Sequence, residues 1–102
     1  MDIEKLITFL ANTDEPFAKV QAELTYGQDI LKHLKGAFVS GSELPVSKAT
    51  EQFYASKHYT NHIDKLHKLN LEQLTMKNKR KTAEMKIEIW RSMEASRRKT
   101  NV

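Results

Sequence analysis

Apolar residues in the first 40 positions recur three and four residues apart, which is the spacing of one helix face. The longest such series follows this spacing without interruption: Phe17, Val20, Leu24, Gly27, Leu31, Leu34 and Phe38. A heptad pattern of this kind predicts a helix that packs along one stripe against another helix. We therefore expect a helix from about residue 15 to residue 39.

Gly27 is the only member of this series without a large side chain. A glycine inside a helix lowers helix stability by about 1 kcal/mol relative to alanine. Its place in the series has two interpretations. Either a large side chain or a helix backbone approaches closely there, or the glycine marks a kink or is merely tolerated.

A shorter apolar stripe precedes this helix and consists of Ile3, Leu6, Ile7 and Leu10. It predicts a short helix over about residues 3–11, for which Asp2 can serve as N-cap. The polar stretch 12–14 is expected to end this helix and to start the next one. Pro16 is acceptable in the first turn of a helix, because the amide hydrogen that it lacks would have no partner there.

No glycine or proline occurs between Val46 and Val102. This absence predicts one long helix over about residues 47–98, because these two residues most often interrupt helices. The best heptad register is Gln52, Ala55, Tyr59, His62, Leu66, Leu69, Gln73, Met76, Arg80, Ala83, Ile87 and Trp90. Its polar members can set the register of a helix pair.

Two parts of this segment leave room for another structure. Asn70, followed by Gln73, resembles a helix start, so a break near residue 70 stays open. Residues 85–89 alternate apolar and polar like a strand, but no second strand is predicted to pair with them. We therefore assign residues 85–89 to the helix.

Together these elements predict an all-α fold, with residues 1–102 as a single helical domain. A short N-terminal helix precedes an antiparallel helical hairpin, whose turn lies at residues 40–45 and whose C-terminal helix is long and coiled-coil-like. That helix is longer than its predicted partner, and the difference in length would leave residues 76–90 uncovered within one chain. We expect a homo-oligomer, most simply a dimer. The predicted contact residues are Ala83, Ile87, Ile89, Trp90 and Met93. A break near residue 70 would instead allow a monomeric three- or four-helix bundle.

Charge is distributed unevenly along the chain. Residues 1–50 have a net charge of −2, whereas residues 51–102 have a net charge of +6. A basic half raises the prospect of a polyanionic partner. The candidate nucleic-acid-binding residues are Lys77, Arg80, Lys81, Arg97 and Arg98. The alternative is a solvated helix face with favourable charge at the helix C-terminus.

Candidate chemistry is sparse. The chain has no cysteine, and no apolar run is long enough to cross a membrane, so we expect a cytoplasmic protein. His58 and His62 have the spacing of a metal-binding pair on a helix, but no third ligand completes a site. No catalytic motif occurs either. We therefore predict no metal, no cofactor and no enzymatic activity.

The stretch Ala83-Glu84-Met85-Lys86-Ile87-Glu88-Ile89-Trp90-Arg91-Ser92, with Ala95, Arg97 and Arg98, resembles the C-terminal signature of small, mostly uncharacterised helical bacteriophage proteins. The earlier segment Tyr54-Ala55-Ser56-Lys57, with Tyr59, is similar to another part of them. The resemblance covers the last half of the chain. It implies a phage or prophage accessory protein in the host cytoplasm, working beside phage recombination or replication proteins.

Three functions are consistent with these observations. The first is a non-enzymatic interaction protein that self-associates and binds a protein partner. The second is a non-specific nucleic-acid-binding protein that uses the basic C-terminal helix. The third is a structural or assembly component of the virion.

Overall fold

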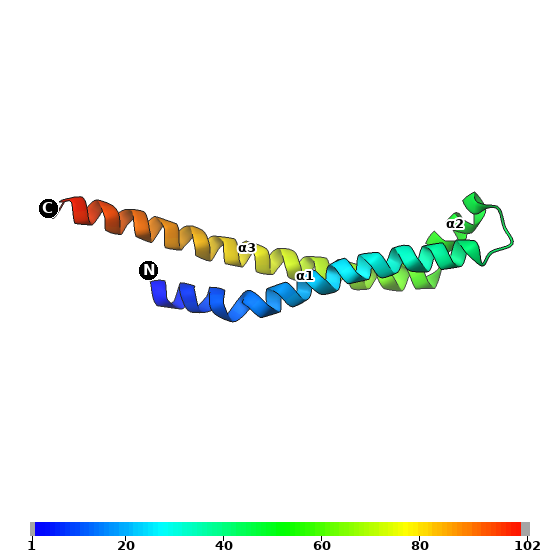
Figure 1. The fold of residues 1–102 in the computed structure, drawn as a ribbon, viewed down its shortest axis with the longest axis horizontal. Coiled ribbons are helices and arrows are strands. Elements are labelled where there is room, and N and C mark those ends of the chain that lie inside the picture. Colours follow the sequence, from blue (N-terminus) through cyan, green and yellow to red (C-terminus); the bar gives the residue numbers. More distant parts are fainter. Residues whose placement is uncertain (1, 101–102) are drawn as a thin grey trace. The chain divides into compact units, whose positions relative to one another are not determined.

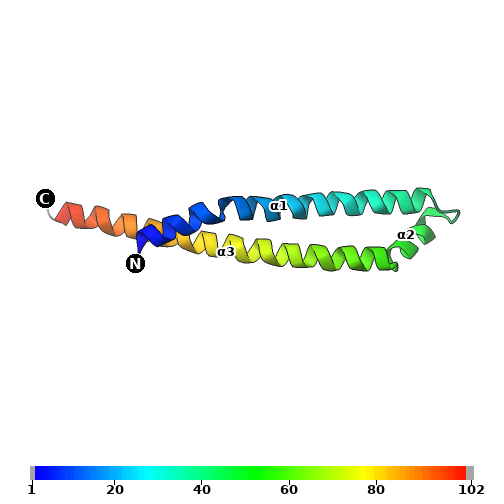
Figure 2. The same cartoon turned by 90° about the horizontal axis from the view of Figure 1, so that it is seen from below.

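The computed structural model describes residues 2–100, which form three α-helices and no strand (Figure 1). These are α1 (Ile3–Ser40), α2 (Val46–Tyr54) and α3 (Lys57–Thr100). The predicted all-α class, the hairpin and the long last helix are confirmed. The chain divides into two compact units, which are described separately below. In each unit a segment of α1 lies beside an antiparallel segment of α3 (Figure 2).

The first unit, Val20–Glu72, is the hairpin. Its turn follows α1 directly, where the Gly41 amide donates a hydrogen bond to the Ala37 carbonyl at 3.0 Å. The Ser42 amide donates to the Val39 carbonyl at 3.2 Å. These bonds satisfy carbonyl groups that the end of a helix leaves without partners. The turn therefore lies where the segment with Gly41 and Pro45 predicts it.

The predicted helix over residues 47–98 is two helices, and the break lies at residues 55–56 instead of near Asn70. Ser56 caps α3, because its hydroxyl accepts a hydrogen bond from the Tyr59 amide at 3.3 Å. This is the geometry of a helix N-cap, which needs neither glycine nor proline. The break changes which side of α2 faces inward. Gln52 and Ala55, predicted to lie in the stripe, are exposed, and Phe53 is buried instead.

Phe53 lies at the centre of an aromatic cluster that joins all three helix segments of this unit. Its side chain is 2% exposed. Its ring centroid lies 5.7 Å from that of Phe38 on α1 and 5.6 Å from that of Tyr59 on α3. Tilted ring pairs at such distances stabilise a fold beyond the area that they bury. This cluster holds α2 against the two longer helices.

Gly27 allows α3 to approach α1 closely. A Cβ atom at this position would lie 2.5 Å from Cδ2 of Leu66. His62 lies beside it, with Nε2 2.8 Å from the Gly27 carbonyl oxygen, so this nitrogen donates the hydrogen bond. Of the two interpretations of Gly27, the close approach of a large side chain is therefore correct. The polar seam residue His62 bonds to the partner helix, as expected of a residue that sets register.

Two glycine substitutions are expected to have opposite effects on stability. Gly27→Leu should lower the free energy of unfolding by about 1–3 kcal/mol, because the new side chain displaces Leu66. Gly36→Ala should raise it by up to about 1 kcal/mol, because nothing lies within 4 Å of the added methyl group and alanine favours the helix. Urea unfolding monitored by circular dichroism measures both. Equal effects of the two substitutions would contradict the close approach at Gly27.

The second unit combines Met1–Lys19 with Gln73–Val102. The boundary predicted between residues 11 and 15 is absent, because α1 continues through Pro16. Asp2 caps the helix as predicted, accepting a hydrogen bond from the Lys5 amide at 3.2 Å. Thr13 is half-buried, and its hydroxyl donates to the Phe9 carbonyl at 2.7 Å. With Thr13 included, the inward positions in this part of α1 keep heptad spacing: Ile3, Leu6, Leu10, Thr13 and Phe17.

Candidate interaction surface on α3

The predicted contact residues are divided between two sides of α3. Ala83 is 4% exposed, while Ile87 and Trp90 are half-buried on the side that faces α1. Ile89 and Met93 are 52% and 65% exposed. Ala83 is therefore not available to a second molecule, and its assignment to an interface is wrong. The reason is that α1 is continuous from Ile3, so its first turns cover part of α3 that was expected to be bare.

The buried side of α3 ends in a charged pair. Glu94 and Arg97 continue the heptad spacing after Trp90, and they form an ion pair at 2.7 Å. The last turns of α3 extend past the start of α1 (Figure 2). Because charged side chains continue the seam there, an apolar seam does not extend into these last turns. Exposed apolar surface in this part of α3 lies instead at Met85, Ile89 and Met93.

Arg80 was predicted to bind nucleic acid, but the structure places its guanidinium group against α1. Nη1 donates hydrogen bonds to the Leu10 carbonyl at 2.8 Å and to the Thr13 hydroxyl at 2.5 Å. Nη2 forms an ion pair with Oδ1 of Asp14 at 2.5 Å. The side chain is 16% exposed, and its guanidinium carbon lies 5.4 Å from the centroid of the Phe17 ring. Arg80 therefore joins the two helices and does not present its charge to a phosphate.

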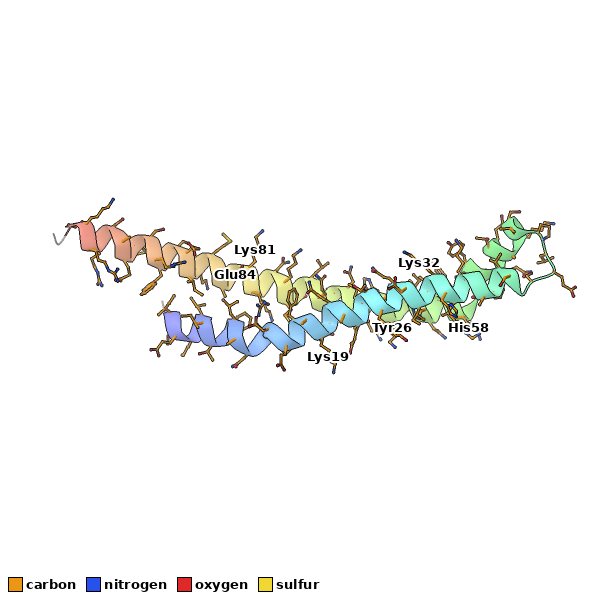
Figure 3. All side chains as sticks on the ribbon, viewed as in Figure 1. Lys19, Tyr26, Lys32, His58, Lys81 and Glu84 are labelled. Atoms are coloured by element: carbon orange, nitrogen blue, oxygen red, sulfur yellow. The ribbon has the colours of Figure 1, made fainter. Side chains whose placement is uncertain are left out.

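The other predicted basic residues do not form one cationic face. Lys77, Lys81 and Arg98 are exposed, and Lys81 extends away from α1 (Figure 3). Arg97 is paired with Glu94, as described above. Lys77 and Lys81 share their side of the helix with Glu84 and Glu88, as helical spacing requires. Acidic residues therefore interrupt the positive charge on that side.

The opposite side of α3 borders a groove of about 360 Å³ between the two helices of this unit. Its apolar lining consists of Leu6 and Phe9 on α1, together with the nearly fully buried Ala83 on α3. Lys79 and Lys86 border it, and Thr82 lies between them. Neither lysine forms an ion pair with any residue in the described range 2–100.

This groove borders a row of residues that the sequence-based prediction missed. The row has heptad spacing and consists of Lys79, Thr82, Lys86, Ile89 and Met93, all of which are exposed. We call these five residues the groove row. The spacing of this row can be read from the sequence, but a search for apolar residues does not find it, because three of its five members are lysine or threonine.

Two further predictions concern metal ligands and membrane-spanning segments within residues 2–100. No group of three histidine, aspartate or glutamate side chains there could hold a metal ion. His58 is exposed, whereas His62 bonds to the Gly27 carbonyl, so the predicted spacing does not make a chelating pair. Within the same range, none of the helices has both the length and the apolar character needed to span a membrane.

A scan against protein-family models, a search of curated proteins and a search of solved structures each found no significant match to this chain. The resemblance of its last half to bacteriophage proteins therefore stays a prediction. What can be said of function depends on the surfaces described above.

Proposed function

We propose that this chain is a non-enzymatic helical interaction protein that self-associates and binds a protein partner, as a phage-type accessory factor beside recombination or replication proteins. The observation that carries this proposal is the exposed apolar surface on α3. Met85, Ile89 and Met93 are each more than half exposed and follow one another at four-residue spacing. Apolar side chains grouped in this way are typical of contact surfaces.

The small number of buried side chains supports the same proposal. Among residues 2–100, the buried apolar residues are Val20, Ala49, Phe53 and Ala83. Small domains with little buried apolar area are marginally stable, and association with another chain is one of the usual ways to bury more apolar area. A partner that binds only the folded chain would also stabilise it by mass action.

Nucleic-acid binding is the alternative, with Lys77, Lys81 and Arg98 as its remaining exposed candidates. The positions of Arg80 and Arg97 favour it less, because each of these arginines is paired within the chain. A structural role in the virion predicts that the protein is present in purified particles, whereas an accessory factor would be absent from them.

Self-association is tested by multi-angle light scattering over a concentration series. We expect the mass to rise from that of one 11.8 kDa chain toward twice that value as concentration increases. A single copy at every concentration would contradict self-association.

A band-shift titration with DNA and RNA, at low and at physiological salt, tests the alternative on the same samples. Binding to phosphates weakens steeply with added salt, because bound counterions are released. A strong, salt-sensitive shift without any self-association would favour the nucleic-acid function over the one proposed here.

A further inference from the structure

We propose that the groove row of α3, together with Leu6 and Phe9 of α1, binds an acidic amphipathic helix of a partner protein. This inference rests on the proposed function and names the chemistry of the partner. The surface lies entirely within the unit formed by the first and last parts of the chain. Three steps lead to it: the shape of the surface, its charge and the spacing of that charge.

The surface has the form that receives a third helix. Two antiparallel helices side by side leave a groove along their line of contact, and here Leu6 and Phe9 supply its accessible apolar lining, with the buried Ala83 beneath. Ile89 and Met93 continue the groove row toward the C-terminus and remain 52% and 65% exposed. An amphipathic helix lies in such a groove with residues i, i+3, i+4 and i+7 as its anchors.

The charge of the surface selects the partner. In the groove row the charged residues are Lys79 and Lys86, and both are cationic. On the opposite side of α3, Glu84 and Glu88 accompany Lys77 and Lys81. Lysines that form no ion pair among residues 2–100, beside an apolar groove, attract acidic helices and disfavour basic ones, because like charges brought together across an interface are unfavourable.

The spacing of the two lysines matches a helix. Lys79 and Lys86 are seven residues apart, which is about 10.5 Å along the helix axis. Two carboxylates one heptad apart on the partner helix would therefore reach both ammonium groups. The aliphatic stems of the lysines can lie along the apolar contact while their charges reach the carboxylates.

The test uses two synthetic amphipathic helical peptides with the same leucine positions. One carries glutamates at seven-residue spacing beside the leucines, and its twin carries lysines there. Fluorescence anisotropy of each labelled peptide, titrated with the full-length protein, gives the two dissociation constants. We expect the acidic peptide to bind at least about tenfold more tightly than its basic twin.

Charge reversal of the groove sharpens the test. The double variant Lys79→Glu with Lys86→Glu should reverse the preference and bind the basic peptide more tightly. The matched control, Lys77→Glu with Lys81→Glu, makes the same change in net charge on the other side of α3 and should keep the preference for the acidic peptide. Ile89→Ser should weaken binding of the acidic peptide severalfold without changing which peptide is preferred.

Several outcomes would overturn the inference: equal affinities for the two peptides, no binding of either up to about 1 mM, or a control variant that reverses the preference. Light scattering on the same samples separates this inference from the proposed function. Dimers that persist without peptide selectivity would leave self-association standing and reject the groove. Dimers that the acidic peptide dissociates would show that a second copy of the chain occupies the groove, which also contradicts an acidic helix of another protein.

Discussion

Replacing Phe53 by alanine is expected to lower the free energy of unfolding by about 3–5 kcal/mol. Phe53 is the one large side chain within residues 2–100 that is fully buried. Its ring lies against Phe38 of α1 and Tyr59 of α3, so its loss leaves a cavity where three helix segments meet. Urea unfolding followed by far-ultraviolet circular dichroism measures the loss.

Tyr54 provides the matched control for this substitution. It is the next residue of α2 and takes part in the same cluster, but it is 46% exposed. Tyr54→Ala should therefore reduce stability by less than half as much as Phe53→Ala. If the two substitutions had equal effects, the burial of Phe53 would not be what holds α2 in place.

Replacing Arg80 by alanine is expected to lower the free energy of unfolding by about 2–3 kcal/mol. The substitution removes the donors to the Leu10 carbonyl and the Thr13 hydroxyl, and it removes the cation from the Phe17 ring. Arg80→Lys should restore little of this loss, because one ammonium group cannot replace the planar guanidinium fork. The same urea titration measures both variants.

Asp14→Asn separates the ion pair from the rest of this network. Asp14 is 64% exposed, so its ion pair with Arg80 should contribute less than about 1 kcal/mol. A loss as large as that of Arg80→Ala would show that the ion pair stabilises this contact, and not the bonds to the carbonyl and the hydroxyl.

Periodicity predicted the inward side of α3 correctly from Tyr59 to Trp90. The side chains there are buried or half-buried at each position of the predicted register, including the polar His62 and Arg80. Three- and four-residue spacing is a geometric property of the helix, so polar members do not disturb it. The structure adds what these polar members do: each donates a hydrogen bond to a carbonyl group of α1.

The positions of the helix boundaries could not be predicted in the same way. The absence of glycine and proline after Pro45 hid the break at Ala55, which depends on a hydrogen bond to the hydroxyl of Ser56. The polar stretch 12–14 suggested a helix boundary, but α1 is continuous there. At this point α1 is contacted by Arg80, which lies 66 residues after Asp14 in the chain. Such distant contacts override local preference, and a single sequence does not show them.

The candidate site was predicted only in part for the same reason. Ile89 and Met93 are exposed as an interface requires, but Ala83 is covered by α1 and Arg80 is bonded to it. Whether a residue on α3 is accessible depends on how far α1 extends along it. The predicted boundary after residue 11 made the helix beside α3 too short, so residues that α1 covers were expected to be exposed. The groove row needed the structure, because Lys79 and Lys86 become informative only when Phe9 is found beside them.

The contact at Gly27 also bears on which changes of chain length the hairpin can accept. His62 and Leu66 contact α1 at Gly27, so the axial register of the two helices is set there and does not depend on the connection between them. Residues inserted into the exposed segment 43–45 would leave that alignment in place. A single residue deleted between Tyr59 and His62 would rotate Tyr59 by about 100° relative to His62 and so away from its contact with Phe53. Related chains should therefore differ in length at the connection and not inside α3.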